Sequence, residues 1–471
     1  MVFNSNTYFV FLPAVFFLFY ISPGQWRMLI LLSASLVFYG SLAVHWLPAL
    51  LLVVIFINYG TGLGIYTSQR EIIKTFLLWV GIGANIFILA SFKYLPVLIE
   101  VKIPFAIGLS YYVFQAISYL VDIHKSKIEP ERHLGYFALY LSFFPQLLQG
   151  PIERAGDLLP QLKQPYIFDY DMARSGLFLF GWGLFKKIVV ADRLALVVNP
   201  VYGNVHAYQG LSLLTATYFY SFQIYMDFSG YTDMALGSAR LFNIRLTQNF
   251  NSPYLAISVS DFWRRWHISL SHFLKDYLYI PLGGNRKGSV RRSINLMATM
   301  CLCGIWHGAG WTYIFWGGLH GLFLTSSAVY RPMQRRIQKF LGIDNFVLLR
   351  VCQILITFNL VCFSWIFFRA NNLSDAFYIV THLTKGFNKA LINYNVFAEH
   401  VFIGVKQGEF ALIICLIFFI MFIDWLSKDR EIGDLILNRS FWLRWTVYYL
   451  LIITILTLGI FGESQFIYFK F

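Results

Sequence analysis

The run WLPALLLVVIFINYGTGLGIYT at residues 46–67 contains no Asp, Glu, Lys or Arg. A helix of about 20 such residues spans the hydrocarbon core of a bilayer. Some of the other apolar runs are short or broken, so we expect about eleven crossings in all. The candidate spans are 7–22, 27–43, 46–67, 73–93, 103–122, 134–149, 175–200, 211–228, 293–306, 311–330, 347–368, 409–427 and 442–462.

The composition is typical of a protein embedded in lipid. Hydrophobic residues make up 58% of the 471 residues and charged residues only 13%, whereas soluble domains carry about 25% charged residues. These values argue against a soluble globule, and the ample apolar surface excludes disorder. The spanning backbone must be helical, because these runs lack the alternation of a barrel and unpaired amides are costly in lipid. The sequence therefore predicts an all-α, polytopic membrane protein with a single domain over residues 1–471.

The net charge of +14 indicates contact with anionic lipid headgroups rather than with nucleic acid. Three hydrophilic stretches separate the apolar runs, at 150–174, 248–292 and 331–345. The positive-inside rule predicts a cytoplasmic loop at Arg331, Arg335, Arg336 and Lys339. It indicates a second cytoplasmic end at Lys186, Lys187 and Arg193. The segment 371–408 has nearly balanced charge, so the sequence does not orient it.

The stretch 262–292 mixes bulky aromatic residues with seven basic residues and one acidic residue. Tryptophan, tyrosine and arginine favour the membrane interface, so we expect a helix in or just below the headgroup layer. Its charges would anchor lipid headgroups, or some of them would bind the phosphates of a donor molecule. The candidates for phosphate contact are Arg264, Arg265, Lys275 and Arg286.

Four of the ten histidines fall between residues 267 and 320. His307 lies within CLCGIWHGAGW (301–311), in apolar surroundings where ionisable groups are costly and usually functional. A neutral imidazole there could accept a proton from a hydroxyl that attacks a thioester. The alternative is a histidine that only packs between helices. His267 is the second candidate for the site, whereas we expect His272 at the surface and regard His320 as compatible with a structural role.

A second polar group lies within SFQIYMDFSGYTD (221–233), where Gln223 and Asp227 share one helix face. A buried carboxylate needs a partner, so Asp227 would orient a histidine, pair with an arginine, or form a purely structural ion pair. No metal site is predicted, because the chain has no HExxH motif. Its five cysteines have no CxxC spacing, which also argues against zinc and against disulfides.

Several motifs together resemble the membrane-bound O-acyltransferase (MBOAT) family. They are DFWRRWHISLS (261–271), YLYIPLGGNRKG (277–288), GIWHGA (304–309), FPQLLQGPIER (144–154), the 227–233 segment, NFNSPY (249–254) and QFIYFKF (465–471). The PLGGNR segment is similar to the alginate O-acetyltransferase branch, which includes peptidoglycan and other polysaccharide O-acetylation proteins. The branch of teichoic acid D-alanyltransferases shares WRRWH but lacks the glycine-rich continuation.

The resemblance implies helices around a central tunnel, with the catalytic core at about 215–325. It implies that His307 is the catalytic base and His267 its partner, in a tunnel lined by Asp227, Gln223, Tyr225, Trp306 and His320. It also implies acetyl-CoA as the cytoplasmic donor and a polysaccharide outside the bacterial inner membrane as the acceptor. A separate periplasmic acetyltransferase would be the partner protein.

Two other classes of protein remain open from the residues alone. Broken helices, an intramembrane Asp227 and paired histidines also suit a proton-coupled transporter or flippase. Inverted repeats would support a transporter, and we find none in the sequence. A scaffold for a cell-envelope complex would have no catalysis of its own, and substitution of His307 would then be silent.

Overall fold

The computed structural model describes residues 1–42, 44–95, 106–341, 347–428, 430–462 and 466–467. These residues form helices joined by turns and loops and contain no strand, which confirms the all-α prediction. The start of the predicted span 103–122, the end of the stretch 331–345 and most of the motif 465–471 lie outside the described residues. The chain divides into two compact units, Met1–Leu184 with Tyr231–Gln248, and Phe185–Gly230 with Asn249–Phe471.

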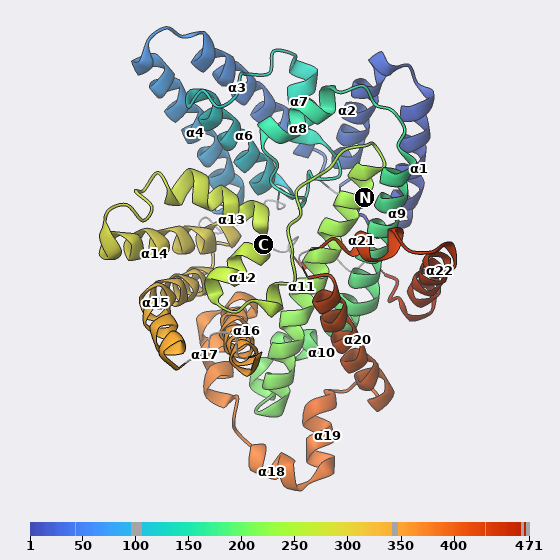
Figure 1. Ribbon diagram of the computed structural model, residues 1–471, viewed down its shortest axis with the longest axis vertical. Coiled ribbons are helices and arrows are strands. Elements are labelled where there is room, and N and C mark those ends of the chain that lie inside the picture. Colours follow the sequence, from blue (N-terminus) through green and yellow to red (C-terminus); the bar gives the residue numbers. More distant parts are fainter. Residues whose placement is uncertain (43, 96–105, 342–346, 429, 463–465, 468–471) are drawn as a thin grey trace. The chain divides into compact units, whose positions relative to one another are not determined.

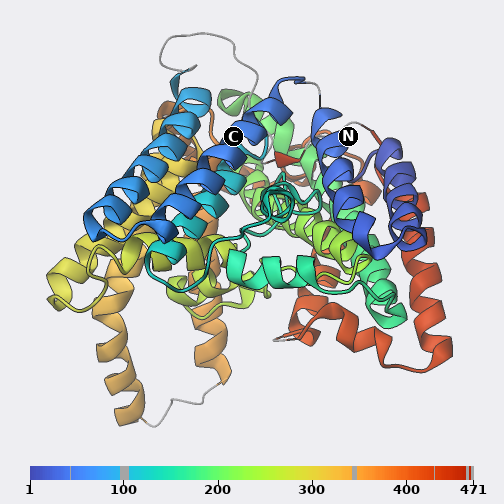
Figure 2. The same ribbon diagram turned by 90° about the horizontal axis from the view of Figure 1, so that it is seen from above.

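In its described residues, the first unit contains eight helices and the last ten residues of α11 (Leu211–Arg240). Within it, α3, α4 and α6 pack against one another, as both ribbon views show (Figures 1 and 2). The eight are α1 (Asn6–Ile21), α2 (Gly24–Gly40), α3 (Leu47–Thr67), α4 (Glu71–Lys93), α6 (Leu109–His124), α7 (Leu134–Ser142), α8 (Ala155–Lys163) and α9 (Tyr170–Leu184).

The second unit contains the first part of α11 and a larger number of short or broken helices. Its helices before α14 are η1 (Phe185–Ala191, a π-helix), α10 (Asp192–Gly203), η2 (Val205–Ala207), η3 (Pro253–Leu255), α12 (Val259–Arg265), α13 (Ile268–Leu274) and η4 (Lys275–Tyr279, also π). Those from α14 onward are α14 (Gly288–His307), α15 (Trp311–Leu341), α16 (Val347–Arg369), α17 (Leu373–His382), α18 (Phe387–Ile392), α19 (Tyr394–Phe402), α20 (Gln407–Leu426), α21 (Ile432–Leu437) and α22 (Phe441–Leu458).

Five helices among the described residues are long and apolar enough to cross a membrane: α3, α4, α16, α20 and α22. Only 6% of the most apolar window of α22 is buried inside the protein, so this helix presents apolar side chains that need a lipid environment. The number of crossings stays a prediction, since the other expected spans are shorter, broken or more polar helices.

Three predicted segments are interrupted in the structure. The span 134–149 ends early, because α7 stops at Ser142 and Pro145 disfavours helix in the residue before it. The span 175–200 is divided among α9, η1 and α10. The predicted interfacial helix is broken, because α12 and α13 have seven residues each and separate at His267.

Candidate functional site

His307 is the last residue of α14 in a tight hairpin with α15 (Figure 1). A Cβ atom at Gly308 would lie 2.3 Å from the ring of Tyr313, so the turn after the histidine requires glycine. Gly304 and Gly317 let the two helices approach closely, because a Cβ on either would lie within 2.3 Å of a carbonyl oxygen of the other helix. The glycines therefore fix the position at which His307 leaves α14.

Aromatic rings enclose His307, which is only 3% exposed. Its ring centroid lies 4.7 Å from Trp306, 5.1 Å from Trp316 and 5.2 Å from Phe368. The ring planes of His307 and Trp316 are perpendicular. This packing restricts rotation of the imidazole and leaves little room for bulk water around it.

His267 joins α12 to α13 in the left-handed conformation, with φ 44° and ψ 56°. Such a conformation is unfavourable for a residue other than glycine, and such strain is concentrated at functional sites. Two hydrogen bonds to Asn249 hold the junction: Ile268 N–H donates to its backbone oxygen at 3.0 Å and Ser269 N–H to its Oδ1 at 3.1 Å. Asn249 therefore positions His267, a role that the sequence did not single out.

The two histidines share one aromatic neighbour. The Trp306 ring lies 6.2 Å from the His267 ring and 4.7 Å from the His307 ring. Phe228 packs edge-on against His267 at 4.8 Å. Burial lowers the pKa of His267 to about 3, so its imidazole is neutral at physiological pH. The structure thus brings together the two histidines that the sequence singled out.

His320 uses both ring nitrogens in hydrogen bonds. Trp263 Nε1 donates to its Nδ1 at 3.2 Å, and its Nε2 lies 2.9 Å from Ser364 Oγ. The Ser364 hydroxyl donates to the Val361 carbonyl, so Nε2 of His320 must carry the proton. This histidine therefore links α12, α15 and α16, and its ring lies 4.9 Å from that of Trp316. These contacts give it a positioning role.

Asp227 pairs with a lysine rather than with a histidine or an arginine. Lys187 Nζ lies 2.7 Å from Asp227 Oδ1 and 2.9 Å from Asp192 Oδ1, and its side chain is 1% exposed. The other oxygen of Asp227 accepts a hydrogen bond from Ile467 N–H at 2.8 Å. Lys187 also lies 4.5 Å from the centre of the Phe466 ring. Asp227 and Lys187 thus contact Ile467 and Phe466, the described residues of the C-terminal motif, and fix their position.

Lys187 and Arg193 are thus not free charges at a helix end, as the sequence interpretation assumed, and the cytoplasmic position of this part of the chain stays a prediction. Both are buried, and Arg193 pairs with Glu409. Charged side chains within an apolar run must find partners inside the protein. The charged residues within 175–200 could therefore have been predicted to form buried ion pairs.

The remaining predicted lining residues lie on α11. Gln223 is buried, and its Oε1 has no hydrogen-bond partner among the described residues. Tyr225 donates its hydroxyl to Asp424 Oδ2 at 2.9 Å.

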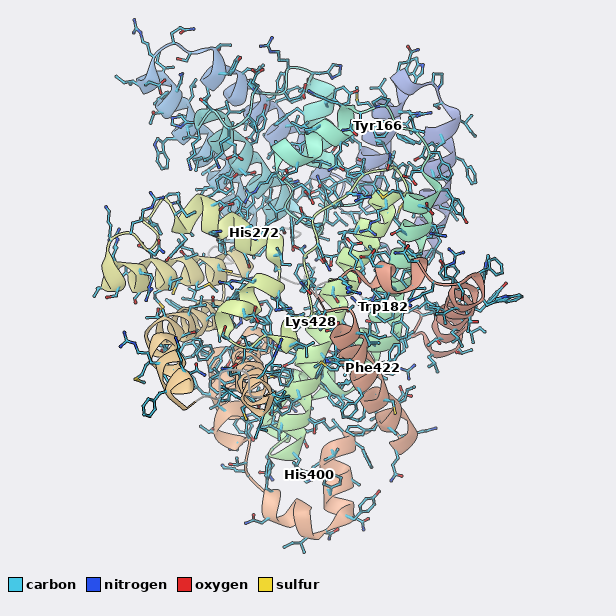
Figure 3. All side chains as sticks on the ribbon, in the orientation of Figure 1. Tyr166, Trp182, His272, His400, Phe422 and Lys428 are labelled. Carbon is cyan, nitrogen blue, oxygen red and sulfur yellow. The ribbon has the colours of Figure 1, made fainter. Side chains whose placement is uncertain are left out.

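The four basic candidates for phosphate contact have different surroundings. Arg264, Lys275 and Arg286 are exposed, whereas Arg265 pairs with Asp261 and donates to a backbone carbonyl. His272 is exposed on α13 (Figure 3). In the described part of the chain, no group of three or more His, Cys, Asp or Glu side chains could hold a metal ion.

Comparison with known proteins shows the family of the chain. Residues 109–367 match the profile of the membrane-bound O-acyltransferase family. The chain is 33% identical to a peptidoglycan O-acetyltransferase of Helicobacter pylori, over all of this chain and 98% of that protein. It is 38% identical to a probable alginate O-acetylase AlgI of Pseudomonas putida, over 80% of this chain and 79% of that protein. A teichoic acid D-alanyltransferase of Bacillus subtilis is 25% identical over 56% of this chain and 68% of its own length. The chain is thus a multi-pass membrane acyltransferase and belongs to the MBOAT family.

Proposed function

We propose that the protein transfers an acetyl group from cytoplasmic acetyl-CoA through the bacterial inner membrane, for O-acetylation of a polysaccharide outside it. The observation that carries the proposal is the placement of two buried histidines whose rings both lie near that of Trp306, in a member of this family. The relatives named for peptidoglycan and alginate point to a cell-envelope or exported polysaccharide. The resemblance to polysaccharide O-acetylation proteins also leads us to include a separate periplasmic acetyltransferase as partner.

His307 acts as general base in this proposal. Its imidazole accepts the proton of the acceptor hydroxyl as the oxygen attacks the thioester carbonyl. His267, held neutral by burial, donates a hydrogen bond to the carbonyl oxygen, where negative charge develops. The carbon–sulfur bond then breaks, and the proton on His307 passes to the sulfur. The products are the acetyl ester and free coenzyme A, so atoms and charge balance.

The aromatic surroundings support this chemistry in two ways. Trp316 and Phe368 limit access of water to His307, which reduces hydrolysis of the donor. The indole N–H of Trp316 is buried without a hydrogen-bond partner among the described residues, as expected of a donor that binds substrate or water.

We infer the orientation from the two spanning helices α16 and α20. Arg336 and Lys339 precede α16, and Lys428 and Arg430 follow α20. Figure 3 shows Lys428 and His400 beyond opposite ends of α20. By the positive-inside rule the basic ends face the cytoplasm, so the segment between α16 and α20 faces outward.

For the donor, the exposed side chains of Arg264, Lys275 and Arg286 are better candidates for phosphate contact than Arg265. The guanidinium of Arg265 is already paired with Asp261.

The test compares His307→Ala with His272→Ala, an exposed histidine five residues beyond His267. Proteoliposomes receive acetyl-CoA with a labelled acetyl group, and both ester formation and release of coenzyme A are measured. General-base help is worth about 10²- to 10⁴-fold, so His307→Ala should lose at least about 100-fold while His272→Ala keeps wild-type activity. Wild-type turnover in a correctly inserted His307→Ala protein would contradict the proposal.

The same assay separates the second candidate, which the Bacillus subtilis relative suggests. A D-alanyl transferase would be inactive with acetyl-CoA and active with a D-alanyl thioester.

A further inference from the structure

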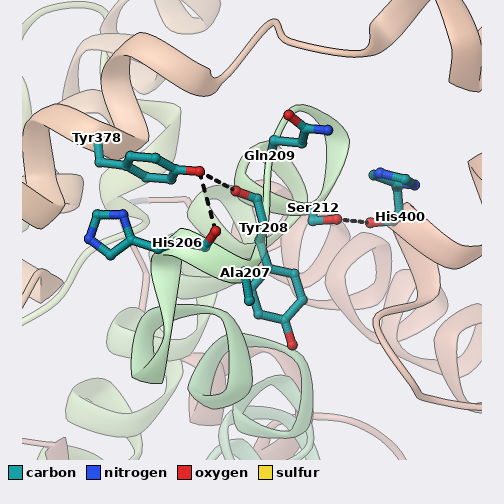
Figure 4. A pocket seen from close by; sticks show the side chains of 7 residues that line it. All are labelled: His206, Ala207, Tyr208, Gln209, Ser212, Tyr378 and His400. Atoms are coloured by element: carbon teal, nitrogen blue, oxygen red, sulfur yellow. Dashed lines mark hydrogen bonds between the residues drawn. The ribbon is translucent and has the colours of Figure 1, made fainter.

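The second unit contains a cavity of about 370 Å³. The residues that line it are distant in the sequence from His267 and His307. Its lining comes from the turn between η2 and α11, from α17 and from α19, through His206, Tyr208, Gln209, Ser212, Tyr378 and His400. Figure 4 shows the 206–212 turn between Tyr378 and His400. The cavity is therefore built where segments distant in the sequence meet.

Hydrogen bonds fix the walls of this cavity. The Tyr378 hydroxyl lies 3.4 Å from the carbonyl oxygen of His206 and 3.3 Å from that of Tyr208 and donates to them (Figure 4). Ser212 Oγ donates to the carbonyl oxygen of His400 at 2.8 Å. Gly210, at φ 56°, allows the 206–212 turn to approach the turn that follows α17, since a Cβ atom there would lie 2.1 Å from the carbonyl oxygen of Lys385. The cavity is thus a defined feature rather than a gap between mobile side chains.

The cavity lies on the outward side in the proposed orientation. Tyr378 and His400 belong to the segment between α16 and α20, which we placed opposite the basic ends of those helices. A ligand there would arrive from the side of the acceptor.

Aromatic packing connects the cavity wall to the surroundings of His307. Phe377, next to Tyr378, lies 5.6 Å from Phe315 and 5.8 Å from Phe367 between ring centres. Those two residues directly precede the Trp316 and Phe368 that enclose the histidine. The helix that carries Tyr378 therefore packs against α15 and α16, which also carry the aromatic neighbours of His307.

The lining favours a hydroxyl-rich, uncharged group. Gln209 offers both a donor and an acceptor in its amide, and the imidazole of His206 offers a second polar group. Among the side chains that the structure describes, no Lys, Arg, Asp or Glu lines the cavity. The imidazole of His206 lies 3.4 Å from Asp375 Oδ1, which orients the ring.

The size is also suitable. A volume of 370 Å³ corresponds to about twelve waters at liquid density, which is room for one hexose ring. Tyr208 adds aromatic surface of the kind that packs against the apolar face of a sugar. The ring of Tyr378 is stacked on His382 at 3.8 Å and meets the ring of His206 edge-on at 4.4 Å, so this tyrosine only shapes the wall.

We propose that this cavity binds one hexopyranose unit of the polysaccharide that accepts the acetyl group. The inference rests on the proposed function, because it assigns the acceptor to the outward side. It adds a binding site separate from the histidine pair, in which Gln209 and His206 hold the hydroxyls of the sugar and thereby present a neighbouring unit to the transfer site.

The experiment uses the full-length protein in lipid nanodiscs, since maltoside detergents would offer their own sugar headgroups. The probes are two defined, uncharged tetrasaccharides, chitotetraose and cellotetraose, and titration calorimetry measures binding. The variants are Gln209→Ala, His206→Ala and their combination. Thr384→Ala is the matched control, an exposed residue of the same outward segment that does not line the cavity.

We expect wild type and Thr384→Ala to bind at least one tetrasaccharide equally. Loss of one hydrogen bond should weaken binding about fivefold, and the double variant should lose about 30-fold. In the transfer assay the same variants should raise the KM for that tetrasaccharide. Failure of the wild type to bind either probe, or unchanged binding in the double variant, would overturn the inference.

His307→Ala keeps the two proposals apart. It should bind the tetrasaccharide as the wild type does and transfer no acetyl group. If it transfers acetyl normally, the proposed function fails, whatever the cavity binds. If it is inactive and Gln209→Ala/His206→Ala binds normally, only the assignment of the cavity fails.

Discussion

Replacement of Lys187 by methionine tests whether the buried charge group holds the second unit together. The lysine lies between Asp192 and Asp227, and all three side chains are at most 8% exposed. Methionine keeps most of the volume of the lysine but removes its charge. The two carboxylates would then remain buried without their shared cation, and Asp227 would still accept the hydrogen bond from Ile467.

The expected magnitude follows from the two distances. At 2.7 and 2.9 Å and an effective dielectric constant of about 20, each contact is worth about 6 kcal/mol of Coulomb energy. Lysine also loses several kcal/mol of hydration on burial, which offsets part of that gain. Removing one partner of a buried pair destabilises proteins by about 3–5 kcal/mol, and we expect Lys187→Met to lower the free energy of unfolding by that amount. The unfolding equilibrium would shift by roughly 10²- to 10⁴-fold.

Equilibrium unfolding in mixed detergent–SDS micelles, followed by tryptophan fluorescence, measures this free energy. Glu71→Gln is the control, because its carboxylate pairs with Lys74 but is 77% exposed, and such pairs are worth at most about 1 kcal/mol. The triple variant Lys187→Met/Asp192→Asn/Asp227→Asn removes all three charges and should be more stable than Lys187→Met alone. A change below about 1 kcal/mol in Lys187→Met, or no recovery in the triple variant, would refute the reasoning.

Three other substitutions test the turn, the histidine junction and the pH response. Gly308→Ala should abolish transfer without preventing membrane insertion, because its Cβ would lie 2.3 Å from an aromatic ring of α15; retained activity would contradict the steric argument. Asn249→Ala removes a hydrogen bond that caps α13 and should cost about 1 kcal/mol. Its turnover should fall as His267 loses its support, so a loss of stability with unchanged kcat would reject the positioning role. Burial raises the pKa of Glu153 from 4.5 to about 7, although two hydrogen bonds from Thr247 lower it in part. Between pH 4.5 and pH 7 the folded state therefore retains a proton that the unfolded state loses. The free energy of unfolding then falls as pH rises through this window, by up to about 1.4 kcal/mol per pH unit. In Glu153→Gln, the free energy of unfolding measured at several pH values should depend less steeply on pH than in the wild type. An equal slope would show that another group causes the pH dependence.

The sequence predicted the uninterrupted apolar helices well, for a simple physical reason. An uninterrupted apolar run has one satisfactory conformation in lipid, so the run 46–67 became α3 and the run 347–368 became α16. It did not predict the two longest helices: α11 continues beyond the expected 228 to Arg240, and α15 continues to Leu341 through the stretch predicted as a basic loop. Prediction failed where local chemistry interrupted an apolar run. Pro145 ends α7 within the span 134–149. The run 175–200 contains a π-helix at its centre. A hydropathy pattern does not distinguish the hydrogen bonds of a π-helix from those of an α-helix.

The candidate site was predicted in its residue types but not in its geometry. His307 and His267 stood out as ionisable groups near apolar sequence, and the family resemblance paired them. The aromatic partners of His307 could not be found in this way, since Phe368 is distant in sequence and only the fold brings it near. Lys187 was misread because a charge in an apolar run looks like the end of a helix until its partner is known.

Both histidines lie where a helix ends, and this explains why the second unit has short helices around them. His307 stands at the end of α14, where Gly308 leaves the helix with extended backbone. His267 stands between α12 and α13 in a left-handed conformation, which costs about 1–2 kcal/mol for a residue other than glycine. A histidine within an unbroken membrane helix would point at lipid or at a packed neighbour. A helix end instead lets the side chain leave the helical surface and approach a second residue from another element, here near Trp306. The breaks at 266–268 and 308–310 are thus requirements of the proposed chemistry, which is why the apolar pattern is weakest in this part of the chain.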